Sequence, residues 1–373
     1  MERWGSVKEL GFGLMRLPQK GLFTDVEQVK AMVDLFLKAG GTYFDTAYVY
    51  LGSEGAVKKA LVDRYPRNRY TLATKCNALM APTEKAAKGQ FRTSLDRTGA
   101  GYFDYYLLHA LMDDNYTKYE KYHLWEFVNE QKERGLIRHL GFSFHGGPRV
   151  LDQLLRDHSE VEFVQLQINY ADWENPSVAS RANYEVARKH NKPIVIMEPV
   201  KGGHLADPPA KIKKLFQEYD PKASPASWAI RFAASLDGVF TVLSGMSNLA
   251  QMKDNLSYMA DFQPLNSEEQ NIIQQAQRIL GHSSTIPCTA CHYCAEGCPK
   301  HIPIPEIFAA MNKQLGNGQR MEAVSAYRKI TAQGRLASEC VGYRQCERAC
   351  PQHLEVTKLL KQCAQALEDT GSI

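Results

Sequence analysis

The stretch Tyr43-Phe-Asp-Thr-Ala-Tyr-Val-Tyr-Leu-Gly-Ser-Glu54 has the pattern of a buried strand that runs into a helix. It begins with aromatic residues and turns polar at Asp45, and Tyr50 follows five residues later. The closing Gly-Ser-Glu can open a helix. The stretch therefore places a carboxylate and a phenol at the end of one strand. A buried strand followed by an ordinary helix cap explains this stretch equally well, so its meaning depends on the rest of the chain.

The same strand–helix alternation continues along the chain. Eight apolar strands, each followed by a helical pattern, fit within about 260 residues. Such strands predict a parallel sheet covered on both faces, and eight units favour a (β/α)8 TIM barrel. An open doubly wound sheet is the alternative, but Gly11-Phe-Gly13 lacks the third glycine and the helix of a phosphate loop. The predicted strands are 7–17, 43–45, 70–75, 103–109, 137–143, 163–168, 193–198 and 239–243.

Helix starts can be predicted between some of these strands. Thr24 and Glu27 form a capping-box pattern, and helical spacing then continues to Leu37. One long helix is predicted through Trp125 and Phe127. We therefore expect an unbroken helix after the first and after the fourth strand.

Composition and charge indicate an ordinary globular protein. Hydrophobic residues make up 44% and charged residues 23%, and the net charge of +4 is too small to indicate a nucleic-acid partner. No apolar run reaches the roughly 20 residues of a membrane span. The first residues lack the apolar region of a secretory signal, so we expect a cytosolic location without a membrane span.

Polar residues stand at the ends of consecutive predicted strands. Asp45 ends the second strand, Lys75 the third and His109 the fourth, and Tyr50 follows Asp45 closely. In a barrel these ends meet at one face, where active sites are built. A lone Lys or His at a strand end is more often a solvated or structural residue, but four converging groups favour a catalytic site. The candidate catalytic residues are Asp45, Tyr50, Lys75 and His109.

These four groups suit one kind of chemistry. A phenol has a pKa of about 10, and a nearby Lys75 cation would favour the phenolate of Tyr50 and so lower that pKa. Asp45 would hold the lysine charge in place, and His109 could donate a hydrogen bond to a substrate oxygen. A general acid with such a partner suits the reduction of a carbonyl group by hydride transfer.

The chain resembles the aldo-keto reductase family over about residues 6–260. The resemblance implies NADP(H) or NAD(H) as the cofactor, a small carbonyl or alcohol as substrate, and the four residues above as the catalytic set. The family's usual N-terminal hairpin is short or missing. The matching stretches are Gly11-Phe-Gly-Leu-Met-Arg-Leu-Pro18, Phe44-Asp-Thr-Ala47 with Tyr50 and Ser53-Glu54, Ala73-Thr-Lys75, Leu107-Leu-His109, Gly141-Phe-Ser143, Met197-Glu-Pro199, and Ser244-Gly-Met246 with Asn255.

The resemblance also implies a nucleotide site. Ser143 and Gln165 would hold the nicotinamide carboxamide, and segments 197–203 and 244–255 would hold the phosphates and adenosine. Ser244 and Gln251 stand where many members carry Lys and Arg for a 2′-phosphate, so NADP and NAD both stay open. The implied cofactor-binding residues are Gly13, Ser143, Gln165, Met197, Pro199, Gly202, Gly245, Met246, Ser247, Gln251 and Asn255.

Eight of the nine cysteines lie between Cys288 and Cys363. Clustered cysteines in a cytosolic chain indicate metal ligands or redox groups rather than disulfides. The run Cys288-x2-Cys291-x2-Cys294-x3-Cys298-Pro299 has the spacing of a two-cluster ferredoxin, in which the fourth cysteine binds the other cluster. Zinc sites usually pair cysteines that lie farther apart. The pattern Cys288-x2-Cys291-His292 also fits haem attachment, but that would require export. We reject it because no signal peptide is visible in the sequence.

A second run, Cys340-x2-Tyr343-x2-Cys346-x3-Cys350-Pro351, has a tyrosine in place of the middle cysteine. The tail thus resembles a helical two-cluster ferredoxin. We expect a second site with three thiolates to hold a [3Fe–4S] cluster, or a labile [4Fe–4S] cluster with Tyr343 or water at its odd iron, or nothing. Crossed ligation assigns one [4Fe–4S] cluster to Cys288, Cys291, Cys294 and Cys350, and the second cluster to Cys298, Cys340 and Cys346.

Two cysteines stand outside these sets. Cys363 lies on an amphipathic helix and is predicted to be a buried apolar residue rather than a replacement ligand. Cys76 follows Lys75, so it is either a packed thiol or one whose pKa is lowered by the lysine charge.

The sequence therefore predicts a reductase barrel at 1–262, a connecting helix and linker at 263–285, and a helical ferredoxin-like iron–sulfur domain at 286–373. The predicted function is NAD(P)H-dependent interconversion of a carbonyl and an alcohol, with Tyr50 as general acid. The clusters either transfer electrons to a one-electron redox partner or only stabilise the tail. The alternative is a redox-sensing or regulatory nucleotide-binding protein whose iron–sulfur domain docks a partner.

Overall fold

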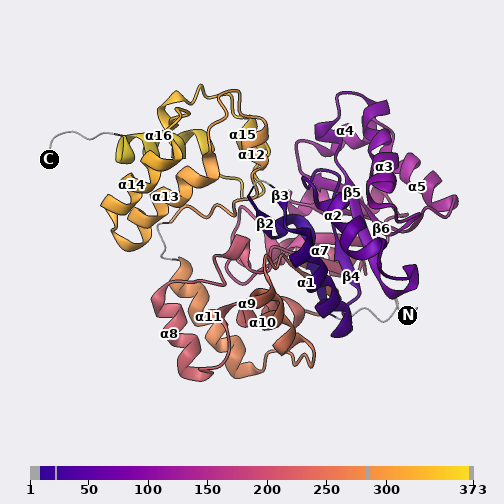
Figure 1. Ribbon diagram of the computed structural model, residues 1–373, viewed down its shortest axis with the longest axis horizontal. Coiled ribbons are helices and arrows are strands. Elements are labelled where there is room, and N and C mark those ends of the chain that lie inside the picture. Colours follow the sequence, from indigo (N-terminus) through magenta and orange to yellow (C-terminus); the bar gives the residue numbers. More distant parts are fainter. Residues whose placement is uncertain (1–8, 22, 282–284, 369–373) are drawn as a thin grey trace. The chain divides into compact units, whose positions relative to one another are not determined.

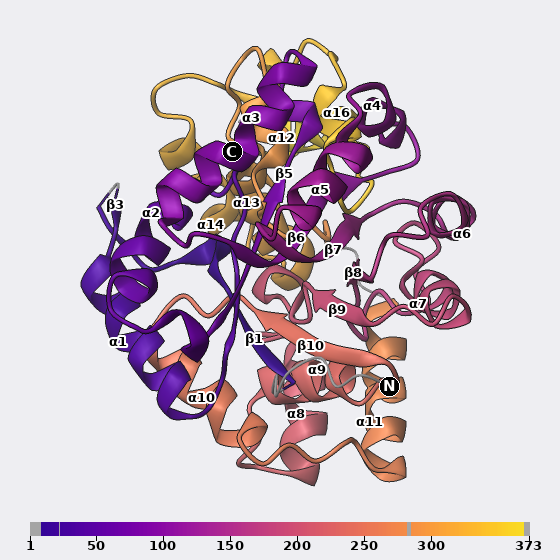
Figure 2. The ribbon, with the colours of Figure 1, turned by 90° about the vertical axis from the view of Figure 1, so that its right-hand side faces the viewer.

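Eight parallel strands close into a barrel, in the order β1-β10-β9-β8-β7-β6-β5-β4. Helices surround these strands on the outside (Figure 2). The closed order confirms the predicted (β/α)8 barrel and excludes an open doubly wound sheet. The strands are β1 (Leu10–Gly13), β4 (Tyr43–Asp45), β5 (Thr71–Cys76), β6 (Phe103–Leu111), β7 (Ile137–Phe144), β8 (Phe163–Gln167), β9 (Ile194–Met197) and β10 (Val239–Ser244).

The computed structural model describes residues 9–21, 23–281 and 285–368 (Figure 1). The chain divides into one unit with Met1–Val200 and Lys213–Ile273, and a second with Lys201–Ile212 and Gln274–Ile373. The boundaries predicted from the sequence stay a prediction. We predict from the sequence that the N-terminal hairpin is short or missing. That prediction concerns residues 1–8, which lie outside the described residues. A small antiparallel hairpin of β2 (Gln19–Lys20) and β3 (Phe23–Thr24) follows β1.

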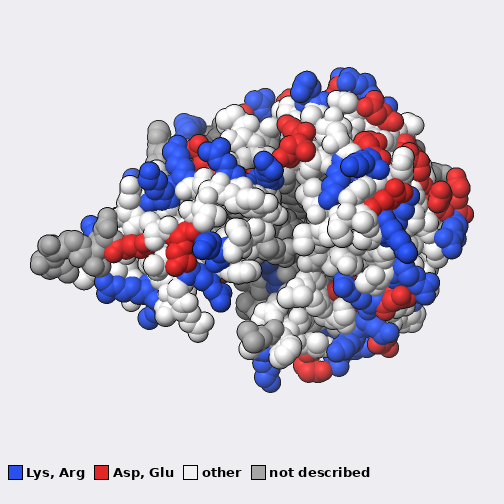
Figure 3. Space-filling view, turned by 90° about the horizontal axis from the view of Figure 1, so that it is seen from above, with Lys and Arg blue, Asp and Glu red and all other residues white. Residues whose placement is uncertain are grey.

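The helices of the barrel half follow the strands in alternation. No helix in the described part of the chain is long and apolar enough to cross a membrane. On the face shown in Figure 3, basic and acidic side chains are interspersed. The helices are α1 (Val26–Lys38), α2 (Ser53–Val57), α3 (Glu84–Thr98), α4 (Tyr116–Lys121), α5 (Leu124–Glu133), α6 (Pro148–Asp157), α7 (Ser180–Lys189), α8 (Ala210–Tyr219), α9 (Pro225–Ala234), α10 (Leu249–Met259) and α11 (Ser267–Gly281).

Two helix predictions are wrong in detail. The N-cap of α1 is Asp25, whose carboxylate accepts a hydrogen bond from the Gln28 amide at 3.1 Å, while Thr24 lies in β3. The single long helix after β6 is two helices, α4 and α5. His123 separates them because its backbone is left-handed, with φ 48°. The backbone conformation and capping of the residue before a helix, not apolar spacing, decide such boundaries.

The inside of the barrel is packed with side chains rather than hollow. Tyr43, Tyr105 and Phe163 are buried there, with ring centroids 5.0 Å apart for the first pair and 5.3 Å for the second. A Cβ added at Gly141 would lie 2.6 Å from the Phe163 carbonyl oxygen, so only glycine fits beside this ring. This filled interior leaves polar strand ends as the place where a ligand can approach.

The C-terminal half is helical, as predicted (Figure 1). Its core contains Phe308, Tyr327, Leu360 and Cys363, all buried. Cys363 is therefore a packed residue, which agrees with its place on an amphipathic helix. The helices are α12 (Tyr293–Glu296), α13 (Ile304–Asn317), α14 (Arg320–Ile330), α15 (Gln345–Arg348) and α16 (Val356–Leu367).

Candidate functional site

A buried ion pair lies at the carboxyl ends of β4 and β5. The Lys75 ammonium donates to Asp45 Oδ1 at 2.5 Å and to the Thr46 carbonyl oxygen at 2.8 Å, and the Lys75 side chain is 0% exposed. Burial raises the pKa of the Asp45 carboxyl and lowers the pKa of Lys75, and the attraction between the two groups opposes both shifts. The contact brings together two of the four predicted catalytic residues.

Tyr50 and His109 complete the group. The Lys75 nitrogen lies 5.0 Å from the centroid of the Tyr50 ring, and the Tyr50 and His109 ring centroids are 5.7 Å apart at 81°. The loop that carries the phenol contains a turn, in which the Tyr50 amide donates to the Ala47 carbonyl oxygen at 3.0 Å. The structure thus gathers Asp45, Tyr50, Lys75 and His109 around one point of the rim.

His109 is held as a neutral imidazole. Burial lowers its pKa well below 6.5, and the Lys75 charge and His145 add to that shift. The Tyr119 hydroxyl donates to the His109 carbonyl oxygen, and Ala110 has φ 58°, which turns the chain directly after the imidazole. A neutral imidazole in a fixed position can donate a hydrogen bond to a substrate oxygen without carrying charge.

Ser143 and Gln165 are register neighbours on β7 and β8. The Ser143 hydroxyl accepts from the Ala110 amide at 2.7 Å, and the Gln165 amide nitrogen donates to the Met197 sulfur at 3.5 Å. Gln165 Oε1 is buried and has no hydrogen-bond partner among the described residues. Because buried acceptors are nearly always paired, this oxygen suits the N–H group of a bound carboxamide. These residues therefore fit a nicotinamide ring.

The start of α10 carries several of the implied nucleotide residues. Asn248 caps the helix by accepting from the Gln251 amide at 2.9 Å, and Gln251 Oε1 accepts from the Ser247 amide at 2.7 Å. Ser244 is buried and donates to Asn255 Oδ1 at 2.6 Å. The N-terminus of a helix suits a phosphate, but neither Ser244 nor Gln251 brings a positive charge.

The remaining implied cofactor residues lie in different surroundings. A Cβ at Gly245 would meet open space and one at Gly13 only ordinary contacts, so packing does not require glycine at either position. Gly202 differs, because it has φ 64° and a Cβ there would lie 2.5 Å from the Thr289 carbonyl oxygen. Its glycine is thus explained by contact with the cysteine-rich segment. Met246 and Pro199 are buried and Met197 is half-buried.

Sequence reasoning missed Asn169, which lies just after β8. Its side-chain amide is buried and donates to Asp172 Oδ2 at 2.9 Å and to the Glu198 carbonyl oxygen at 3.1 Å. Glu198 also pairs with Arg16 at 3.4 Å. The signal that could have found Asn169 is the one that found Lys75 and His109, a polar residue at the end of a strand.

Seven cysteines of the tail line two cavities. The structure describes all nine cysteines, and none of them is in a disulfide. No group of three or more His, Cys, Asp or Glu side chains in the described residues is arranged to hold a metal ion, whereas cysteines spread around a larger space fit a cluster of several irons. Cys288, Cys291, Cys294 and Cys350 line the first cavity, and Cys298, Cys340 and Cys346 line the second.

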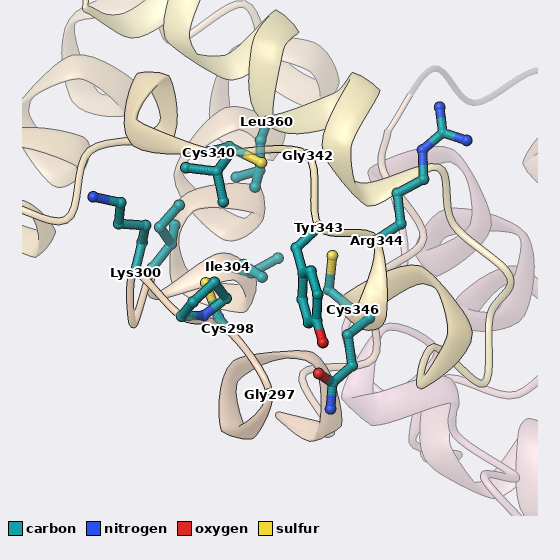
Figure 4. Close-up of a pocket in the computed structure, with 14 residues that line it drawn as sticks. Gly297, Cys298, Lys300, Ile304, Cys340, Gly342, Tyr343, Arg344, Cys346 and Leu360 are labelled. Carbon is teal, nitrogen blue, oxygen red and sulfur yellow. The ribbon is translucent and has the colours of Figure 1, made fainter.

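Tyr343 lines the second cavity but is largely exposed. The residue is 64% exposed, and its hydroxyl lies at the end of the ring that points away from the Cys340 sulfur (Figure 4). Three of the described residues that line this cavity are cysteines, and no fourth cysteine is among them. Cys76, in contrast, is the last residue of β5 and is buried in the hydrophobic core, and burial raises its pKa to about 12.

Comparison with known proteins gives two family matches. Residues 9–278 match the model of the aldo/keto reductase family, and residues 287–355 match a 4Fe-4S dicluster domain. An aldo-keto reductase of Mycobacterium avium is 27% identical over 276 residues, which cover 73% of this chain and 87% of that protein. Aldo-keto reductase str7 of Strobilurus tenacellus is 30% identical over 213 residues, which cover 53% and 60%.

Solved structures of the same family are also similar. An aldo-keto reductase from Bacillus halodurans, in its holo form, has a TM-score of 0.57 and 28% identity, covering 72% of this chain and 92% of that one. An aldo/keto reductase from Klebsiella pneumoniae in complex with NADP and acetate has a TM-score of 0.60 and 20% identity, covering 73% and 92%.

Proposed function

The chain belongs to the aldo/keto reductase family and carries a 4Fe-4S dicluster domain, and from this premise we propose that it interconverts a small carbonyl compound and an alcohol with NADP(H) or NAD(H). One observation carries the proposal: the buried Lys75–Asp45 pair lies beside Tyr50 and His109. A buried charged pair beside a phenol has a clear use in proton transfer.

In the proposed mechanism each of the four residues has one role. The bound dihydronicotinamide supplies the hydride. The Tyr50 hydroxyl gives its proton to the substrate oxygen as negative charge develops there, and neutral His109 donates a hydrogen bond to the same oxygen. The Lys75 cation stabilises the phenolate that remains on Tyr50, and Asp45 keeps the ammonium in place.

Two residues would orient the cofactor. Gln165 offers a buried acceptor without a partner among the described residues, and Ser143 is its register neighbour. We assign both to the nicotinamide carboxamide. The α10 N-terminus would hold phosphate, and the uncharged Gln251 leaves both NADP and NAD as candidates.

Turnover with a panel of aldehydes and ketones tests this function. Purified protein should oxidise NADPH or NADH in the presence of at least one of them, and the alcohol should form in equal amount. Nucleotide binding without turnover of any compound would instead favour the regulatory alternative.

We further propose that both cysteine sets hold clusters that exchange electrons with a one-electron partner. The first cavity has four cysteines, which suits a [4Fe–4S] cluster, and the second has three. A hydride carries two electrons, whereas a cluster usually carries one. Direct electron transfer between the nicotinamide and a cluster would therefore need a step that splits the electron pair. Iron analysis of anaerobic protein should give about seven to eight irons per chain if both sites fill, and about four if one does.

Replacing Lys75 should shift the pH dependence of reduction. Reduction needs the protonated phenol, so the rate falls as pH rises through the pKa of Tyr50. Lys75→Met removes the cation that favours the phenolate, so that fall should move to higher pH. The measurement is kcat/KM against pH for both proteins. Asp45→Asn should give a smaller shift, and an unchanged profile in Lys75→Met would show that the lysine does not act through Tyr50.

The second cluster should respond to the missing cysteine. Tyr343→Cys places a thiol in the middle of the second run, and we expect it to convert a three-thiolate site into a stable [4Fe–4S] site, adding about one iron per chain. Iron analysis and EPR of anaerobic protein measure this. Tyr343→Phe is the matched control and should leave the iron count as it is, because it removes a hydroxyl but adds no thiolate. Two stable cubane clusters in the parent protein would contradict the argument.

A further inference from the structure

The segment that follows β9 contacts the lining of the first cysteine cavity through three closely spaced residues. The Lys201 ammonium donates to Gln352 Oε1 at 3.2 Å, and His204 Nε2 lies 2.7 Å from the Cys288 carbonyl oxygen. Between them Gly202 packs directly on the Thr289 backbone. Cys288, Thr289 and Gln352 all line the first cavity. Lys201 is only 7% exposed, and burying so hydrophilic a side chain is costly, so its position calls for a reason.

The contact with Lys201 determines how the Gln352 amide is oriented. An ammonium group has only donors, so the amide oxygen must face Lys201 and the amide nitrogen must face the other way. That nitrogen is buried and has no hydrogen-bond partner among the described residues, while the whole side chain is 5% exposed. Gln352 lines the cavity together with Cys288, Cys291, Cys294 and Cys350. A donor is thus left at the wall of a cavity that has cysteine sulfurs around it.

We propose that Gln352 donates an N–H···S hydrogen bond to the first cluster, and that Lys201 holds this amide in place and adds its own positive charge. The inference rests on the proposed [4Fe–4S] assignment of this cavity. An electron added to the cluster makes its sulfurs more negative, so a donor and a cation stabilise the reduced form more than the oxidised form. Lys201 and Gln352 therefore raise the reduction potential, and they are positioning and tuning residues rather than ligands.

The test is the midpoint potential of the first cluster in the full-length protein. Anaerobic protein is titrated with dithionite and followed by EPR for the parent and for Gln352→Met and Lys201→Met, which keep side-chain length but remove the donor or the charge. Each variant should lower the equilibrium constant for reduction about tenfold, which is about 59 mV for a one-electron couple. Because Lys201 acts partly through the hydrogen bond of Gln352, the double variant should change less than the two single changes added together.

Controls separate this inference from the cluster assignment. Lys300 is exposed and lines the second cavity, so Lys300→Met should leave the first potential unchanged. Lys201→Arg, which keeps the charge, should recover part of the loss, and the deuterium sensitivity of the iron–sulfur vibrations should weaken in Gln352→Met. Unchanged potentials in Gln352→Met and Lys201→Met at full iron content would overturn the inference. A parent protein without a cubane signal would instead overturn the cluster assignment.

Discussion

Tyr50→Phe is expected to lower kcat for carbonyl reduction by about two to four orders of magnitude, the range for a lost general acid. The change removes one hydroxyl and keeps the ring that lies 5.0 Å from the Lys75 nitrogen and 5.7 Å from the His109 ring. The packing of the site should therefore persist, and so should nucleotide binding. Steady-state kinetics with the best substrate of the panel, together with fluorescence titration of the nucleotide, measure both quantities.

Tyr48→Phe is the matched control for this experiment. Tyr48 lies two residues away in the same loop, and its ring packs 4.7 Å from the Arg97 guanidinium carbon, a contact that phenylalanine keeps. We expect a rate close to that of the parent. If Tyr50→Phe reduced the substrate at the parent rate, or if both variants lost the same activity, Tyr50 would not be the proton donor.

The pKa of His109 affects how the pH dependence of kcat/KM is interpreted. Burial and the nearby Lys75 charge lower this pKa, so both favour the neutral form of the imidazole. A change of rate near neutral pH should therefore come from groups other than His109. This supports the assignment of the fall in reduction rate at high pH to the Tyr50–Lys75 pair.

Cys294→Ala is expected to remove the first cluster, with a loss of about four irons per chain. Cys294 is buried at the wall of the first cavity, where burial and the neighbouring Cys291, Cys288 and Cys350 thiols raise its pKa. A raised pKa makes the thiolate unfavourable, and binding to iron offsets that cost. Iron analysis and the visible spectrum of anaerobic protein measure the loss.

Cys363→Ala is the matched control, because Cys363 is also buried but lines neither of the two cavities. It should keep all the iron and lose about 1 kcal/mol of stability, the cost of a cavity the size of a methyl group. Loss of iron in Cys363→Ala would assign that thiol to a cluster. Full iron in Cys294→Ala would remove Cys294 from the ligand set.

Several features could be read from the sequence because they depend on local order along the chain. Strands and helices differ in apolar period, and eight repeats of one unit favour the closed barrel that the structure has. Polar residues at strand ends then had to meet at one rim, which is why Asp45, Lys75 and His109 could be grouped. Helix breaks were harder, since the left-handed turn at His123 depends on backbone conformation and leaves no periodic signal.

From the sequence alone one can predict the barrel, the group of four residues at its rim and the two sets of cysteines, because strand ends and ligand spacings follow a fixed order along the chain. The folded structure was needed to show that Gln165 has a buried oxygen without a partner among the described residues, that Tyr343 is largely exposed, and that Lys201 reaches Gln352. Lys201 and Gln352 are 151 residues apart. A contact over such a separation is set by packing between distant segments, and no periodicity or spacing in the sequence records it.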